Sequence, residues 1–364
     1  MTRAARASVD LGALRANLRT ARDAAGPSRV MAVIKSDGYG HGLTAVAHAL
    51  ANEADAFAVT DLAEATALRE AGIRQRIVLL QGPFGSEEIH DAAARNLELV
   101  IHTQWQVEAL ARAELSHPVT AWIKVDTGMH RLGFPPAAVP DVWRRLTEAA
   151  SVRPDIGFMT HLACADDRDD PMTPRQLRAF EDACAGLPGP RSAANSAGLL
   201  GWPESRYEWV RPGIMLYGAS PFIDERPDDP ELAPAMALEG QVVAVRRLSA
   251  GDPIGYGATW ACPEDMPIGV VSVGYGDGYP RHAPTGTPVE VAGHRTQLLG
   301  RVSMDMIAVD LRGLEDAVGE GQPACLWGGA VRAEEVAAAS GTIPYELFCR
   351  TPPRPQRIYS GADG

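Results

Sequence analysis

Eight short apolar runs alternate with helical patterns along the first part of the chain, and this alternation limits the fold more than any other feature. Each run has the length and composition of a buried strand, although the one at 191–196 is shorter and weaker. Strands that alternate with helices form parallel sheets, either an open doubly wound sheet or a closed barrel. Eight units within about 220 residues favour an α/β fold of the (β/α)8 TIM-like barrel type, which typically has about 250 residues. The runs are residues 29–35, 56–60, 76–82, 97–103, 119–128, 156–166, 191–196 and 209–218.

Two of the intervening helices carry start and stop signals. Asp10 is a candidate N-cap before leucines at helical spacing, and Gly26 would end that helix. Asp61 and Glu64 have the spacing of a capping box. We therefore expect one helix directly after Asp10 and another directly after Asp61.

From Pro234 onward the pattern changes to alternating apolar and polar residues, interrupted by glycine and proline. This pattern predicts a second, mostly antiparallel β-strand domain, with one short helix at 332–341. The Pro- and Asp-rich stretch just before it marks a boundary. We assign residues 1–232 to the barrel and residues 233–364 to a C-terminal β domain.

Composition excludes several classes of protein. With 46% hydrophobic residues the chain is globular, and its net charge of −12 argues against nucleic-acid or anionic-membrane partners. The five cysteines are scattered without a C-x-x-C pair, so neither a disulfide framework nor a zinc site is indicated. The first residues lack the apolar segment of a secretory signal, and no run reaches the roughly 18 apolar residues of a membrane span. We expect a cytoplasmic protein.

Residues 32–42, AVIKSDGYGHG, end a predicted strand with Lys35, which is followed by glycines and a tyrosine. Lysine is rarely buried unless it is paired or used. Lys35 is therefore either a surface residue or a reactive amine. Desolvation at a strand end would lower the pKa of this amine and make it a nucleophile for carbonyl compounds.

Other polar residues also interrupt the apolar runs at their carboxyl ends, where barrels gather their ligand-binding groups. Each has a structural alternative. Lys124 and Arg131 could form a surface pair, and His161 could be a satisfied core histidine. The full set is Lys35, Lys124, Asp126, Arg131, His161, Asn195, Ser196, Arg211, Gly213 and Ile214.

The later members of this set have alternatives of the same kind. Asn195 and Ser196 could cap a helix, although a helix N-terminus is also where a phosphate binds. Arg211 could be a turn residue, and Gly213 could simply permit the turn. Residue type alone does not decide between these interpretations.

These motifs resemble those of the pyridoxal-phosphate-dependent alanine racemases, and they occur in the same order along the chain. The resemblance extends over nearly the whole sequence and both predicted domains. One such motif would be weak evidence, whereas the ordered set is specific. The matching segments are residues 35–42, 124–133, 161–166, 195–197, 211–218, 274–281, 300–305 and 341–350.

The resemblance implies a role for each matching residue. Pyridoxal 5'-phosphate would form a Schiff base with Lys35, Arg131 would bond its phenolic oxygen, and Arg211 would face its pyridine nitrogen. His161 would lie against the ring. Lys124 takes the position of a lysine that is often carbamylated in the family, where the resulting anion would orient Arg131. The cofactor phosphate would be held by Tyr39, Asn195, Ser196, Gly213, Ile214 and Tyr345.

The resemblance also implies a homodimer with shared active sites. Tyr256 would be the second base, donated by the other subunit, and Met304 of that subunit would contact the substrate together with Arg131. A tyrosine has an ordinary pKa of about 10, so a base at neutral pH needs a lower pKa, which a chain through His161 to the cation of Arg211 would provide. The narrow channel leading to the active site would be lined by Asp166, Tyr275, Arg281, Arg301 and Tyr345.

The activity implied is interconversion of L-alanine and D-alanine by two bases, which would supply D-alanine for peptidoglycan. Three alternatives are a serine or broad-specificity racemase, a non-catalytic barrel protein that binds the same cofactor, and a decarboxylase with two domains. The last two are disfavoured by the C-terminal segment and by residues 124–133 and 211–218. The tail at 351–359 is a looser form of the family pattern, and none of the roles given above depends on it.

Overall fold

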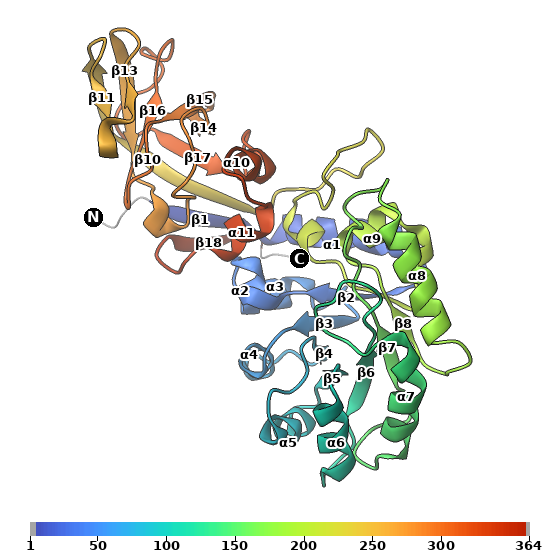
Figure 1. The fold of residues 1–364 in the computed structure, drawn as a ribbon. Helices are drawn as coiled ribbons and strands as arrows, with labels where there is room; N and C mark the ends of the chain where they lie inside the picture. Colours follow the sequence, from blue (N-terminus) through green and yellow to red (C-terminus); the bar gives the residue numbers. More distant parts are fainter. Residues whose placement is uncertain (1–4, 362–364) are drawn as a thin grey trace.

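A barrel and a second, β-rich unit lie side by side in the computed structural model, which describes residues 5–361 (Figure 1). Eight parallel strands form the closed barrel, and β2 pairs with β9 to complete it. The prediction of a closed barrel is therefore confirmed, and the open sheet is excluded. The strands are β2 (Arg29–Val33), β3 (Ala56–Val59), β4 (Arg76–Leu79), β5 (Glu98–Ile101), β6 (Thr120–Lys124), β7 (Gly157–Met159), β8 (Arg191–Ser192) and β9 (Trp209–Val210).

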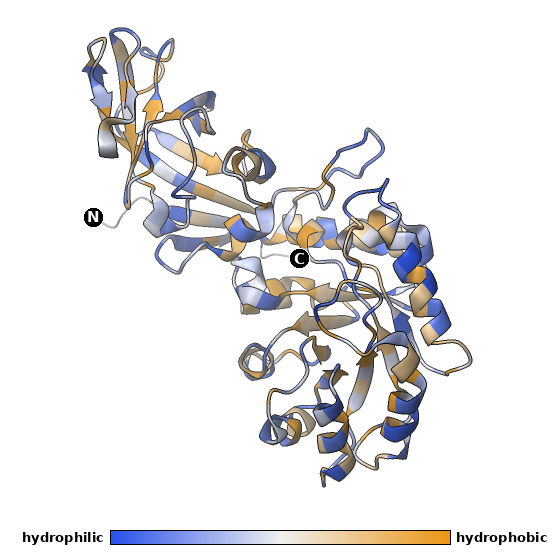
Figure 2. Cartoon of the chain, viewed as in Figure 1, coloured by the Kyte–Doolittle hydropathy of each residue, from blue (hydrophilic) through white to orange (hydrophobic). Residues whose placement is uncertain are grey.

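Helices surround the barrel, with their apolar sides inward and their polar sides outward (Figure 2). The first begins as predicted, because Asp10 accepts hydrogen bonds from the backbone of Gly12 and Ala13. These helices are α1 (Leu11–Ala25), α3 (Leu43–Leu50), α4 (Leu62–Glu70), α5 (Ser86–Ala94), α6 (Gln104–Arg112), η1 (Pro136–Ala138), α7 (Val139–Glu148), α8 (Met172–Ala183), α9 (Ser196–Gly201), η2 (Pro203–Ser205) and η3 (Ile214–Tyr217).

The capping box predicted for α4 forms only in part. Asp61 accepts from the backbone of Glu64 at 2.9 Å, as expected. The carboxylate of Glu64 instead accepts from the backbone N–H of Asp37 at 3.1 Å and of Thr60 at 3.3 Å. Glu64 therefore links the start of α4 to the loop that follows Lys35.

The second unit is a mostly antiparallel eight-stranded sheet with the order β13-β16-β15-β14-β17-β10-β1-β18. A two-stranded ribbon and two short helices accompany it. Its elements are β1 (Arg6–Asp10), β10 (Met236–Leu248), β11 (Pro253–Ile254), η4 (Tyr256–Ala258), β12 (Trp260–Ala261), β13 (Met266–Val271), η5 (Tyr275–Asp277), β14 (Pro288–Val291), β15 (His294–Leu299), β16 (Ile307–Asp310), β17 (Pro323–Trp327), α10 (Ala333–Ala339), α11 (Pro344–Cys349) and β18 (Gln356–Ser360).

The two ends of the described chain meet in this second sheet. Strand β1 pairs antiparallel with β10 and parallel with β18. Residues 6–10, which the sequence interpretation placed with the barrel, therefore pair with the C-terminal sheet, and the division at residue 232 remains a prediction. One continuous apolar cluster, which includes Trp122, Tyr217 and Trp327, spans both units.

The C-terminal tail reaches the loop that follows Lys35. Arg357 and Tyr359 of β18 contact Asp37, Gly40 and His41, which lie in the loop after Lys35. Within residues 5–361, no helix is long and apolar enough to cross a bilayer.

Candidate functional site

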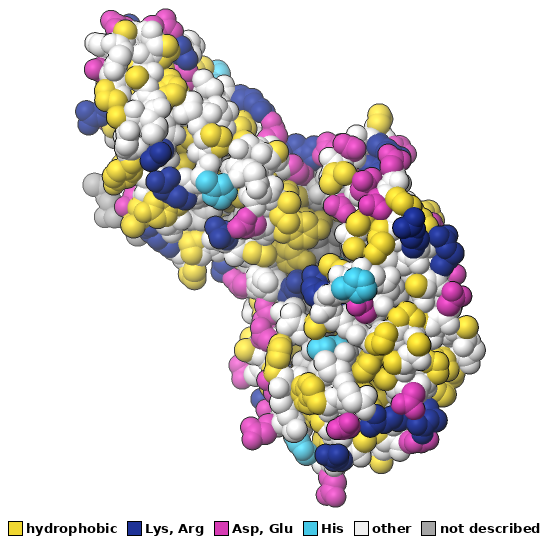
Figure 3. Space-filling view, in the orientation of Figure 1, with side chains coloured by type: hydrophobic (Ala, Val, Ile, Leu, Met, Phe, Trp, Pro, Cys, Tyr) yellow, Lys and Arg dark blue, Asp and Glu magenta, His cyan; other side chains and the backbone are white. Residues whose placement is uncertain are grey.

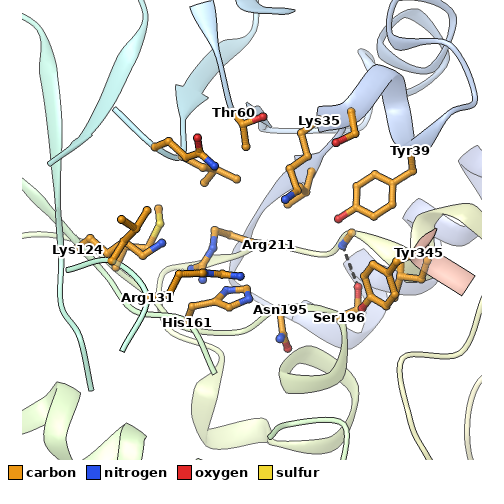
Figure 4. A pocket seen from close by; sticks show the side chains of 18 of the residues that line it. Lys35, Tyr39, Thr60, Lys124, Arg131, His161, Asn195, Ser196, Arg211 and Tyr345 are labelled. Carbon is orange, nitrogen blue, oxygen red and sulfur yellow. Dashed lines mark hydrogen bonds between the residues drawn. The ribbon is translucent and has the colours of Figure 1, made fainter. Parts of the chain in front are cut away.

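A cavity of about 600 Å³ opens at the carboxyl ends of the barrel strands (Figure 4). Most of the residues that the sequence singled out line it together. Their location on one cavity supports a shared function, while the individual roles remain predictions. They are Lys35, Tyr39, Lys124, Arg131, His161, Asn195, Ser196, Arg211, Gly213, Ile214 and Tyr345.

Lys35 reaches this cavity from a tight turn, α2 (Lys35–Tyr39), directly after β2. Its side chain is half-buried and lines the cavity, so the reactive-amine interpretation fits better than a surface lysine. Burial, helped by the charge of Arg131, lowers the pKa of the Lys35 amine. A lower pKa leaves more of this amine neutral and nucleophilic.

Hydroxyl and backbone donors gather at one end of the cavity. The ring of Tyr39 stacks on Tyr217 with 4.6 Å between centroids, and burial raises the pKa of Tyr39, which stays protonated and able to donate. Ser196 Oγ accepts from the backbone N–H of Gly213 at 2.8 Å, and Tyr345 closes this end. Donors without a carboxylate suit a bound phosphate.

Close approach of the backbone shapes this donor end. A Cβ added to Gly213 would lie 2.8 Å from Tyr39 Oη, so only glycine leaves the space between them open. Asn195 also has the structural role considered above, because it caps α9 by accepting from Gly198 N at 2.8 Å. The N-cap alternative for Asn195 is therefore correct whether or not it also contacts a ligand.

Two lysines, two arginines and two histidines line the rest of the cavity. Burial and the charges of Arg211, Arg131 and Lys35 lower the pKa of Lys124 to about 8. Burial and the same basic neighbours lower the pKa of His161 well below its usual value, so the imidazole is neutral. Among the residues that line the cavity in the described chain, none is aspartate or glutamate. The site is therefore built to receive an anion.

Arg211 is the most deeply buried of these bases. Its guanidinium donates to Ser192 Oγ at 2.6 Å, to the Thr160 carbonyl at 2.6 Å and to the Ala193 carbonyl at 3.2 Å. Burial lowers its pKa to about 10, which still leaves it cationic at neutral pH. These bonds hold Arg211 rigidly from the barrel strands, which argues against the role of a simple turn residue.

The remaining predicted residues do not line this cavity within one chain. Tyr256 is 66% exposed and Met304 is 52% exposed, both on the second unit. A Cβ on Gly257 would lie 3.2 Å from Arg301, which places Arg301 against the Tyr256 turn. The remaining channel residues also lie outside the lining. Arg281 lies 5.9 Å from the ring of Tyr275, and burial together with the nearby carboxylate of Asp166 raises the pKa of Tyr345.

Several residues that line the cavity were missed. Thr60 and His102 directly follow the apolar runs of β3 and β5, and Gln81 follows that of β4. The rule that found Lys35, a polar residue directly after a strand, would have found them. A stronger signal was also overlooked, because Lys35 and Lys124 are the only two lysines in the sequence and both line one cavity.

The residues present fit pyridoxal phosphate. An amine lies between a donor-rich end and an arginine-rich end, and the volume is in the range of small-molecule sites. Within residues 5–361, no group of three or more His, Cys, Asp or Glu side chains could hold a metal ion. The fold and cavity thus define a class, that of barrel proteins whose lysine site suits an anionic cofactor that carries a carbonyl group.

Comparison with known proteins identifies the family within this class. The sequence profile "Alanine racemase, N-terminal domain" matches residues 9–221, and "Alanine racemase, C-terminal domain" matches residues 235–359. The chain belongs to the alanine racemase family. Because both profiles match, the alternative of a barrel-only cofactor-binding protein is set aside.

Individual relatives match this chain over nearly its whole length. The chain is 74% identical to "Alanine racemase" of Halorhodospira halophila over 357 residues, which covers 98% of each chain. It is 48% identical to "Alanine racemase, catabolic" of Pseudomonas putida, covering 95% of this chain and 96% of that one. The solved "biosynthetic alanine racemase from Pseudomonas aeruginosa" superposes with a TM-score of 0.95 at 44% identity, covering 99% of this chain and 100% of that one.

The space between Gly213 and Tyr39 leads to a prediction. Replacing Gly213 with alanine should weaken binding of pyridoxal phosphate about 10- to 100-fold, because the new methyl group displaces the Tyr39 hydroxyl. The measurement is quenching of tryptophan fluorescence as the cofactor-free protein is titrated. Gly319→Ala is the matched control, since a Cβ there meets nothing within 4 Å. Equal affinities for the two variants would contradict the prediction.

Proposed function

We propose that the protein interconverts L-alanine and D-alanine with pyridoxal 5'-phosphate as cofactor and two bases on opposite faces of the substrate. The observation that carries this proposal is the Lys35 amine placed between a donor-rich end and a basic end of the cavity, in a chain of the alanine racemase family. Names of relatives such as "Alanine racemase" support alanine as the substrate.

The cavity residues would each contact a particular part of the cofactor. Lys35 would bind its aldehyde, and Arg211 and His161 would contact the ring. Arg131 would bond the phenolic oxygen and the substrate carboxylate. When bound, the cofactor withdraws the electron pair that remains after the Cα–H bond of the amino acid breaks. The phosphate would be held by Tyr39, Asn195, Ser196, Gly213, Ile214 and Tyr345.

Racemisation requires that a proton leave one face of Cα and return to the other. Lys35 Nζ, whose pKa is lowered by burial, is suited to hold that proton on one face. The second base would be the hydroxyl of Tyr256 of the partner subunit, on the opposite face. His161 stays neutral and Arg211 stays cationic, so neither side chain offers a negative charge that would keep the Lys35 amine protonated.

A homodimer would bring Tyr256 to the cavity. In one chain Tyr256 is exposed on the second unit and lines no part of its own cavity, which is incomplete without it. Hydrophobic side chains gather where the two units meet and on the second unit (Figure 3). Exposed Met304, Met306 and Ile343 belong to the second unit and add apolar surface for a second copy of the chain.

The cellular role we propose is supply of D-alanine for peptidoglycan by a cytoplasmic enzyme. Relatives are named both "catabolic" and "biosynthetic", so the direction of flux is a separate question from the reaction. The reaction is tested with L-alanine, added pyridoxal phosphate and deuterated water. Exchange of the Cα proton together with loss of optical rotation is expected. A protein that binds the cofactor but moves no proton of alanine, or that prefers serine, would contradict the proposal.

Lys124 is proposed to carry a carbamate. Only the neutral amine reacts with carbon dioxide, and a pKa of about 8 leaves roughly a tenth of this amine neutral at pH 7. Carbamate formation should therefore increase as the pH rises from about 7 to about 9. The resulting anion would face Arg131 in a cavity whose lining otherwise carries only basic charges among the described residues.

The carbamate can be tested by NMR, because the sequence has only two lysines. Protein equilibrated with ¹³C-labelled carbon dioxide should show a carbamate signal by NMR that Lys124→Arg lacks and Gly319→Ala retains. Since Lys35 is the only other lysine, assignment needs few variants. A signal that persists in Lys124→Arg would mean that the carbamate is elsewhere.

A further inference from the structure

The loop after Lys35 has an unusual backbone. Ser36, Asp37, Gly38 and Tyr39 have φ angles of 55°, 56°, 61° and 50°, so four consecutive residues are left-handed. This conformation is unfavourable for residues with a Cβ, and runs of it are rare. The turn begins at Lys35 and ends at Tyr39, both of which line the cavity. Its shape therefore fixes the position of the amine relative to the phosphate-binding end.

A strand of the second sheet holds this turn. Arg357 of β18 pairs with Asp37, with 2.7 Å from Nη2 to Oδ2, and its Nε donates to the Gly40 carbonyl at 3.1 Å. Tyr359 donates its hydroxyl to the His41 carbonyl at 3.1 Å. Arg357 and Tyr359 are two residues apart, so they share one face of the strand.

The contact between strand and loop is tight. A Cβ on Gly42 would lie 2.1 Å from the Tyr359 hydroxyl, so the loop approaches the strand as closely as glycine allows. The Arg357 side chain is only 20% exposed. Asp37 also accepts from Leu43 N at 2.8 Å, at the start of α3. Asp37 thus joins β18 to a barrel helix within one turn of Lys35.

The same loop is supported from its inner side. His41 is fully buried against Tyr217 and Phe348, and its Nδ1 lies 2.8 Å from the Tyr39 carbonyl. The contacts of Arg357 and Tyr359 connect the loop after Lys35 to the eight-stranded sheet, because β18 pairs with β1, and β1 with β10.

We propose that Arg357 and Tyr359 are positioning residues for the reaction, which hold the left-handed turn and thereby place Lys35 and Tyr39 in the cavity. This inference rests on the proposed function and deepens it. A displacement of about 1 Å at a reacting group can cost about 100-fold in rate. Loosening the turn should therefore lower kcat more than it changes KM.

The test compares Arg357→Gln and Tyr359→Phe with matched controls. Arg6→Gln removes an ion pair to Glu239 in the same sheet, with 2.9 Å between Nε and Oε2. Tyr207→Phe removes a hydroxyl that donates to Glu181 at 3.1 Å, far from the cavity. Racemisation gives kcat and KM. A second readout uses cofactor-free protein, in which ¹³C-methylated lysine amines are titrated by NMR to obtain the midpoint for Lys35.

Arg357→Gln is expected to lower kcat about 10- to 100-fold with little change in KM. Tyr359→Phe should lower it about 3- to 10-fold, since only one hydrogen bond is lost. Both should raise the titration midpoint of Lys35, because a looser turn hydrates the amine. The controls should leave kcat within about twofold of the wild-type value. They should leave the Lys35 titration midpoint within a few tenths of a pH unit of the wild-type value.

The inference is overturned if the β18 variants lower thermal stability but leave kcat and the Lys35 midpoint at control values. If Arg357→Gln does not fold, Tyr359→Phe alone decides, because it removes a single oxygen. If the wild type does not racemise alanine, the proposed function fails. The Lys35 midpoint in the same variants then still decides whether β18 positions the amine.

Discussion

Lys35→Ala is expected to abolish racemisation, with a loss of at least about 10⁴-fold in kcat, near the upper end of what a positioned acid or base contributes. The variant removes the only amine at the end of β2. In the wild type, burial lowers the pKa of this amine, which suits it to accept a proton. The other lysine cannot replace it, because Lys124 extends from β6 on another wall of the cavity (Figure 4). The temperature of thermal unfolding should change little, because the charge that the substitution removes is only half-buried.

Chemical rescue separates loss of the base from loss of the fold. Methylamine is small enough to enter a cavity of about 600 Å³ and should restore part of the activity of Lys35→Ala. It should not restore Tyr256→Phe, in which Lys35 is intact. Residual racemisation by Lys35→Ala within about tenfold of the wild type, with no added amine, would mean that Lys35 is not the base.

Periodicity in the sequence was sufficient to predict the barrel. Apart from β8 (Arg191–Ser192), the buried parallel strands lie in nearly continuous apolar runs, and Asp10 and Gly26 mark the ends of α1 by local chemistry. Strands β1 and β18 were missed for a physical reason. They are short, lie near the chain ends, and are defined by pairing with partners hundreds of residues away, such as Val9 with Met236. Local patterns carry no information about such pairing.

In the site, too, local patterns predicted some residues and could not predict those that depend on long-range contacts. Lys35, Lys124 and Arg211 could be found because each is a polar residue that ends an apolar run. The support of the turn after Lys35 by Arg357 could not, since it depends on the path of the tail in three dimensions. The capping spacing of Glu64 was correct as a signal of a helix start, but tertiary structure directs its carboxylate to Asp37 instead.

Tyr256→Phe is expected to lower racemisation by about 10²- to 10⁴-fold, because it removes one oxygen and with it the base on one face of Cα. Lys35 remains to act on the other face. In deuterated water the variant should therefore still exchange the Cα proton of one enantiomer, the one that Lys35 deprotonates, while the other enantiomer exchanges far more slowly. If both enantiomers kept their exchange rates, Tyr256 would not be a base in this reaction.

Mixed dimers test whether Tyr256 acts across subunits. Each cavity in a dimer would combine Lys35 of one chain with Tyr256 of the other, so Lys35→Ala and Tyr256→Phe homodimers both lack activity. Random mixing makes about half of the dimers hybrid, each with one intact site, which should restore about a quarter of the wild-type activity. Mixing Lys35→Ala with Gly213→Ala is the control, at a pyridoxal phosphate concentration too low to load the Gly213→Ala sites, because both changes lie in the same cavity and every hybrid site is then defective. Restoration in the control, or none with Tyr256→Phe, would exclude a shared site.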